Sequence, residues 1–195
     1  MPARKLALVA CLGGVALGVV DFILQKILPY PWANLANSSA VWAVAAFALG
    51  CWVRTGLLRA AAAAVTLLVI AVPSYYLAAT LIQQDNLSNA WAPTSLLWMF
   101  FGVLAGVVFG PAGVWARSSG WHQIAGTALP AAVLLAEAAR LLNRNLIATA
   151  VIEAALGLAL IVIVGRSNRV RLLALAAALP LAAIGFLGFE LAGFA

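Results

Sequence analysis

Charged side chains recur at helical spacing near residue 140, inside a largely apolar chain. Glu137, Arg140 and Arg144 are separated by three and four residues, so they share one face of a helix. Glu153 lies on the next apolar segment, and the turn between the two segments is so short that they must be antiparallel neighbours. Glu153 can therefore reach Arg140 or Arg144. Two interpretations follow: an ion pair that only locks two helices together, or a site for a ligand or a proton.

A second group combines a carboxylate with aromatic side chains. Asp21 and Gln25 are four residues apart and share one helix face. The other polar and aromatic side chains expected at the same end of the molecule are Asn37, Trp42, Tyr75, Tyr76 and Trp98. Aromatic faces attract cations, so these residues indicate a pocket for a small polar or cationic molecule. Asn37 or Ser38 has a simpler alternative role as the N-cap of the following helix.

The residues that enzymes use most often are not arranged for catalysis. His122 is the single histidine, so neither a zinc-protease helix nor a serine nucleophile with a histidine base is present. No glycine-rich loop followed by lysine could hold a nucleotide phosphate. Cys11 and Cys51 are isolated and lack the spacing of metal ligands. We therefore expect no enzymatic activity, no cofactor and no metal site.

The elements that position these residues are apolar helices. Hydrophobic residues make up 66% of the 195 residues and charged residues 8%, and the mean hydropathy is +1.11, values typical of a membrane protein. Helices of about 20 residues satisfy their own backbone in lipid. We predict an all-α bundle forming one integral membrane domain over residues 1–195. The predicted spans are residues 6–28, 38–53, 57–82, 94–116, 122–142, 146–165 and 170–194.

The second predicted span is the shortest. Its 16 residues reach only about 24 Å at 1.5 Å per residue, less than the roughly 30 Å of hydrocarbon. The positive-inside rule nevertheless favours seven spans, with the N-terminus inside and the C-terminus outside. Eight basic residues then lie on the inner side, against Lys26, Arg140 and Arg144 on the outer side. The eight are Arg4, Lys5, Arg54, Arg59, Arg117, Arg166, Arg169 and Arg171.

The same topology explains the net charge of +6. Basic residues at the inner surface contact anionic lipid, so membrane lipid is an expected partner. Nucleic acid is not, because the chain offers no contiguous soluble basic surface.

Small residues recur every four positions on two of the predicted helices. Such stripes let helix backbones approach closely in lipid. They can receive a neighbouring helix of the bundle, or a second copy of the chain or another membrane protein. The stripes consist of Ala10, Gly14 and Gly18 on the first helix, and of Gly102, Gly106 and Gly110 on the fourth.

Several short segments, in consistent order, also resemble a known family. They read LANSSAVW at 35–42, AFALG at 46–50, SYY at 74–76, GVVFGPAG at 106–113 after Trp98, and LAE at 135–137. Over residues 8–142 the chain is similar to a domain-of-unknown-function family of small actinobacterial membrane proteins. The resemblance implies a multi-pass protein of the bacterial plasma membrane, without supplying an activity.

Two functions are consistent with these observations. In the first, an outward-facing polar pocket binds or transports a small molecule, with Asp21, Glu137 and Glu153 as charge partners. In the second, the chain is a non-catalytic interaction or scaffold subunit of a membrane complex, and its ion pairs are structural. Conservative substitution of Glu137 and Glu153 would separate them, because the first predicts lost binding and the second lost assembly or stability.

Overall fold

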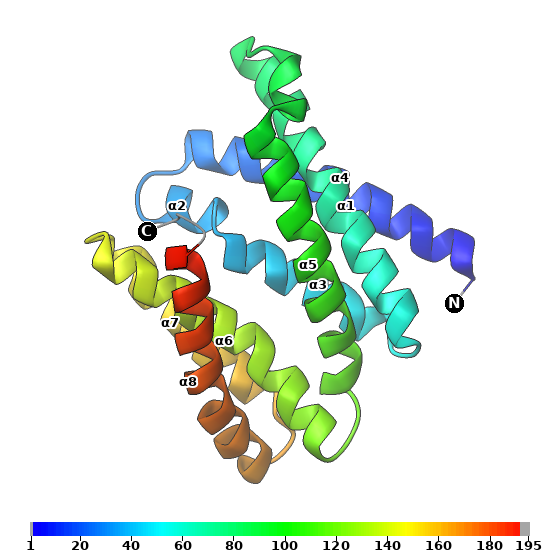
Figure 1. The fold of residues 1–195 in the computed structure, drawn as a ribbon, viewed down its shortest axis with the longest axis vertical. Helices are drawn as coiled ribbons and strands as arrows, with labels where there is room; N and C mark the ends of the chain where they lie inside the picture. Colours follow the sequence, from blue (N-terminus) through cyan, green and yellow to red (C-terminus); the bar gives the residue numbers. More distant parts are fainter. Residues whose placement is uncertain (1, 192–195) are drawn as a thin grey trace.

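The computed structural model describes residues 2–191, and all regular structure in that range is helical (Figure 1). The all-α prediction is thus confirmed. The helices are α1 (Ala3–Ile27), α2 (Trp32–Ala36), α3 (Ser39–Val53), α4 (Leu57–Gln83), the 3-10 turn η1 (Leu87–Trp91), α5 (Pro93–Ala116), α6 (Trp121–Asn143), α7 (Ile147–Val164) and α8 (Asn168–Leu191). Residues 192–194 of the last predicted span lie outside the described residues.

Six of the described helices, α1 and α4 to α8, are long and apolar enough to cross a membrane. The second predicted span, residues 38–53, corresponds to α3, which has only 15 residues and a length of about 22 Å. Its first turn is not at the surface, because the N-cap residue Ser38 is buried. The chain instead reverses through α2 and re-enters the bundle before α3 begins (Figure 1). The in-or-out orientation of the bundle remains a prediction.

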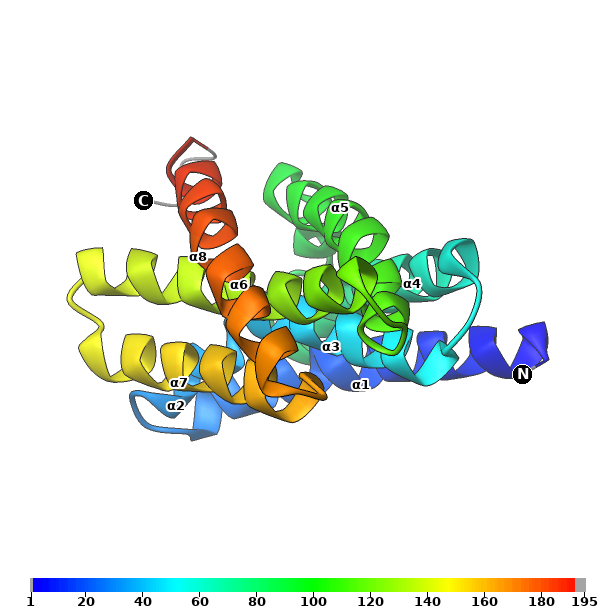
Figure 2. The same ribbon diagram turned by 90° about the horizontal axis from the view of Figure 1, so that it is seen from below.

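The helices form two groups. In the first, α4 packs against α1, α5 and α3; in the second, α6 packs against α7 and α8. Contacts of α6 with α5 and α3 join the groups, and Figure 2 shows α2 lying beside α7. Most of the fully buried apolar side chains are alanines, as expected for helices that associate through close backbone approach rather than through exclusion of water.

The small-residue stripes are contacts within the chain. On α1, a methyl group added to Gly14 or Gly18 would collide with backbone atoms of α4. On α5, one added to Gly106 would collide with Val65 of α4. Ala10 and Gly102 are likewise buried, Gly102 with its backbone against Leu68. Both stripes therefore serve to seat α4 between α1 and α5.

The loops divide the molecule into two ends. At one end, here called the α1–α2 end, lie the α1–α2, α4–α5 and α6–α7 connections. Lys26 of α1 donates to Gln83 of α4 there, at 3.1 Å, and the Ala148 amide of α7 donates to the Tyr30 hydroxyl. At the opposite end, Arg166 donates to the carbonyl of Arg117. Side chains at opposite ends of the bundle are too far apart to contact one another.

Candidate functional site

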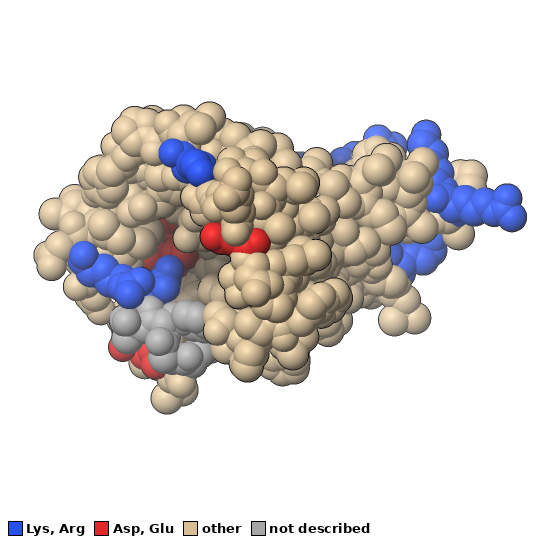
Figure 3. Space-filling view, turned by 90° about the horizontal axis from the view of Figure 1, so that it is seen from above, with Lys and Arg blue, Asp and Glu red and all other residues tan. Residues whose placement is uncertain are grey.

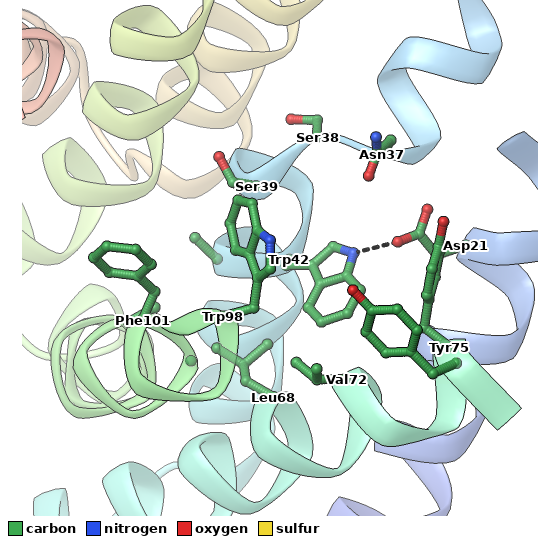
Figure 4. Close-up of a pocket in the computed structure, with 14 residues that line it drawn as sticks. Asp21, Asn37, Ser38, Ser39, Trp42, Leu68, Val72, Tyr75, Trp98 and Phe101 are labelled. Atoms are coloured by element: carbon green, nitrogen blue, oxygen red, sulfur yellow. Dashed lines mark hydrogen bonds between the residues drawn. The ribbon is translucent and has the colours of Figure 1, made fainter. Parts of the chain in front are cut away.

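A pocket of about 320 Å³ lies between α1, α3, α4 and α5, in the half of the bundle nearer the α1–α2 end (Figure 4). That volume is at the small end of the range for ligand pockets. Helices α1, α3, α4 and α5 each contribute side chains to its walls. The lining residues are Asp21, Asn37, Ser38, Ser39, Trp42, Ala43, Leu68, Val72, Tyr75, Tyr76, Trp98, Phe101, Gly102 and Ala105.

Asp21 is the anionic group of the pocket. Its side chain is held from two sides, each at 2.9 Å. Trp42 Nε1 donates to Oδ2 (Figure 4), and Gln25 Nε2 donates to Oδ1. The Tyr75 hydroxyl donates to Gln25 Oε1 at 3.4 Å, which extends the chain of hydrogen bonds to α4. Asp21 is only 5% exposed. These contacts fix the position of the carboxylate, while each oxygen keeps further lone pairs for another donor.

Aromatic rings line the pocket, with Tyr75 beside this carboxylate and with Trp98 and Phe101 farther across (Figure 4). Tyr75 packs edge-on against Phe22, with ring centroids 5.3 Å apart, and against Tyr76 at 5.4 Å. Trp98 and Phe101 form a similar pair at 6.1 Å on α5. Since such rings present an electron-rich face, they favour a positively charged or partly apolar guest.

The described lining of the pocket carries negative charge only. Among the described residues that line it, Asp21 alone is charged. Figure 3, a view onto the face with the α4–α5 connection, shows carboxylate atoms recessed in a hollow with basic side chains at its edge. A guest that neutralises the buried Asp21 carboxylate is better suited to this pocket than an anion.

A second polar centre lies behind the pocket, around Glu137 of α6. Its Oε2 accepts three hydrogen bonds from the start of α3: the Ser38 hydroxyl at 3.1 Å, the Ser39 hydroxyl at 2.7 Å and the Ala40 amide at 2.6 Å. Its Oε1 accepts one from Arg140 Nη2 at 2.8 Å. Ser38 is also the N-cap, since its Oγ accepts from the Val41 amide. A buried carboxylate thus satisfies one orphan amide, that of Ala40, and complements the dipole of a helix that begins inside the bundle.

Glu153 of α7 has a different environment. It is 0% exposed, and neither carboxylate oxygen has a hydrogen-bond partner among the described residues. Ser38, Glu137 and Arg140 lie near enough to act on it electrostatically. The predicted reach of Glu153 to Arg140 or Arg144 is therefore not realised as a hydrogen bond. Arg140 bonds to Glu137 of its own helix, three residues away, because that pair needs no contact between helices.

The structure divides the residues that the sequence grouped together. Asp21, Asn37, Trp42, Tyr75, Tyr76 and Trp98 line the pocket, and Gln25 supports Asp21 from outside it. Glu137, Arg140 and Glu153 form the second centre, which Ser38 and Ser39 connect to the pocket. Arg144 is exposed at the end of α6 and belongs to neither.

Sequence reasoning missed several lining residues. Ser39, Phe101 and Ala105 were not singled out, and Gly102 was assigned only to helix packing. A usable signal existed for α5: Trp98, Phe101, Gly102 and Ala105 follow at helical spacing on one face. For Ser39 there was none, because its role depends on where α6 lies.

Comparison with known proteins places the chain in a family. Residues 1–193 match the model of a family described as a family of unknown function (DUF6518), and the chain belongs to it. The match extends beyond residues 8–142, over which the sequence had indicated a resemblance. No curated protein and no solved structure matches the chain. Together with the six long apolar helices, this defines a membrane protein of a family of unknown function.

Proposed function

We propose that this protein binds a small organic cation in the pocket at the α1–α2 end, as a capture or transport component of the bacterial plasma membrane. The observation that carries the proposal is the Asp21 carboxylate, held by Trp42 and Gln25 and walled by aromatic rings, in a pocket whose described lining residues include no basic side chain. A carboxylate supplies charge and the rings supply cation–π contact. Both the carboxylate charge and the cation–π contact favour a positively charged guest.

The role is proposed to be non-enzymatic. Among the described lining residues, one carboxylate is combined with hydroxyls and one amide, and no histidine or cysteine is present to act as a base or nucleophile beside it. By the positive-inside rule, the α1–α2 end faces outward. The guest is therefore taken from the outer side of the membrane.

The interaction-subunit alternative has less support. It rested on the small-residue stripes of α1 and α5, and these pack against α4 of the same chain. A homo-oligomer or other membrane partner would have to use different surfaces.

The test is calorimetric titration of the full chain in lipid nanodiscs. The two probes are choline and its neutral carbon isostere, in which carbon replaces the quaternary nitrogen. Choline is expected to bind and the isostere to bind at least about tenfold more weakly, a difference of about 1.4 kcal/mol, since only the charge differs. Equal binding of the two probes would contradict charge recognition.

Two pairs of variants locate the site. Asp21→Asn keeps the size of the side chain and is expected to weaken choline binding about 10- to 100-fold; Asp85→Asn, at an exposed position of the same end, is the matched control. Trp98→Leu is expected to weaken it about 3- to 30-fold, a cation–π loss of about 0.5 to 2 kcal/mol, against exposed Trp91→Leu as control. Equal effects of site and control variants would place the guest elsewhere.

A further inference from the structure

The two buried carboxylates of the second polar centre differ in a way that assigns them different protonation states. Glu137 is 1% exposed and accepts four hydrogen bonds, one of them from the Arg140 guanidinium. Glu153 is 0% exposed and accepts none from the described residues. The surroundings of Glu137 suit an ionised carboxylate. Those of Glu153 do not, because an isolated buried charge costs many kcal/mol.

The net charge of the centre leads to the same conclusion. Glu137 and Arg140 compensate each other at 2.8 Å. An ionised Glu153 would add a negative charge near Glu137, with no hydrogen-bond donor to its oxygens among the described residues. The other charged groups that α6 and α8 carry at this end, Arg144 and Glu190, are exposed to the surroundings. One positive charge, held at Glu153, makes the centre neutral.

We propose that Glu153 binds a proton, and that this proton exchanges with the pocket through the Ser38 hydroxyl. A proton needs a single oxygen, whereas a metal cation takes about six oxygen ligands and would be repelled by the nearby guanidinium. Ser38 has the position required of a relay. It lines the pocket, donates to Glu137 at 3.1 Å and is near enough to Glu153 to act on it electrostatically.

The transfer requires only proton movement between oxygens. The Ser38 hydroxyl first turns from Glu137 Oε2 to donate to a Glu153 oxygen. A water in the pocket then gives a proton to Ser38 Oγ while the hydroxyl passes its own proton to Glu153, so the serine is unchanged and the water becomes hydroxide until solvent neutralises it. Loss of the proton is the reverse. This site stands independently of the proposed cation guest, since its argument uses only the α3, α6 and α7 contacts.

The experiment is infrared difference spectroscopy of the full chain in nanodiscs at neutral pH, with no added ligand. A carboxylic acid has a carbonyl band that a carboxylate lacks. The wild type is expected to show this band, and transfer to D₂O is expected to shift it. Glu153→Gln should remove the band, whereas Glu190→Gln and Asp21→Asn should retain it. Glu153→Gln is also expected to fold, because glutamine resembles the neutral acid in shape and charge.

Three results would overturn the assignment. The first is absence of the band from the wild type at neutral pH. The second is a band that survives in Glu153→Gln but is lost in Asp21→Asn or Glu190→Gln. The third is a band that does not shift in D₂O, which would mean a sealed site and no relay through Ser38. A thermal stability that rises with NaCl but not with an equal concentration of a bulky organic chloride, and only when Glu153 is present, would show a sodium ion in place of the proton.

Discussion

Replacing Glu137 by glutamine tests how the buried start of α3 is held. The substitution keeps the size of the side chain but removes its charge and one of its two acceptor oxygens. The remaining carbonyl oxygen can accept either from the start of α3 or from Arg140. The amide nitrogen of the glutamine then faces the other set of donors. Because it cannot accept a hydrogen bond, those donors lose their partner.

The magnitude follows from those contacts. Removing one partner of a buried ion pair costs about 3 to 5 kcal/mol. The Arg140 side chain is 14% exposed, so part of its charge can be solvated when Glu137 no longer pairs with it. We therefore expect Glu137→Gln to lower the free energy of unfolding by about 2 to 4 kcal/mol. Arg140→Gln in the same chain should restore part of the loss, because it removes the uncompensated charge.

The assay is unfolding of the purified protein in mixed micelles by titration with a denaturing detergent, followed by tryptophan fluorescence. Glu190→Gln, at an exposed position, is the matched control and is expected to change the free energy by less than about 0.5 kcal/mol. If Glu137→Gln unfolds like this control, then Glu137 does not anchor α3 and the interpretation of its four contacts is wrong. If the double variant loses as much free energy of unfolding as the two single variants together, then Glu137 and Arg140 do not stabilise each other.

Three further predictions use the same protein. Gly18→Leu, in the contact of α1 with α4, should lower stability by about 1 to 3 kcal/mol through overpacking, while Gly188→Leu, with open space around it, should not; equal effects would refute the assigned contact. Ser38→Ala should cost about 1 to 2 kcal/mol through the lost N-cap and donor, against no change for exposed Ser88→Ala in thermal unfolding. In a chain without its native cysteines, Ser88→Cys should react with an impermeant thiol reagent from outside intact cells and Ser118→Cys should not; the opposite pattern would reverse the topology.

Hydropathy and charge were sufficient to predict most of the fold. The predicted spans 57–82 and 122–142 differ by one residue at most from the ends of α4, Leu57–Gln83, and of α6, Trp121–Asn143. The boundaries are sharp because Gly56 and Gly120, with φ of 83° and 67°, stand at the helix starts. Helix ends of this kind depend on local composition, so the sequence predicts them.

The polar centre was only partly predictable. Spacing placed Glu137 and Arg140 on one face, and they do form a pair. It could not show that Glu137 would reach Ser38, Ser39 and Ala40, which are almost a hundred residues away in the sequence. That contact depends on α3 beginning inside the bundle, a tertiary arrangement that no local pattern records. Glu153 does lie near Arg140, as the short turn between the two segments predicted, but without a hydrogen bond to it.

The short length of α3 has an electrical consequence. Its roughly 22 Å covers about three quarters of a 30 Å hydrocarbon layer, so if its last turn lies at the inner edge of that layer, its first turn, beside the pocket, lies about one quarter of the way in from the outer edge. A monovalent cation that reaches this depth crosses about a quarter of the transmembrane voltage, worth about 0.6 kcal/mol per 100 mV. A resting potential, negative inside, would then draw cations into an outward-facing pocket, and depolarisation would weaken their retention.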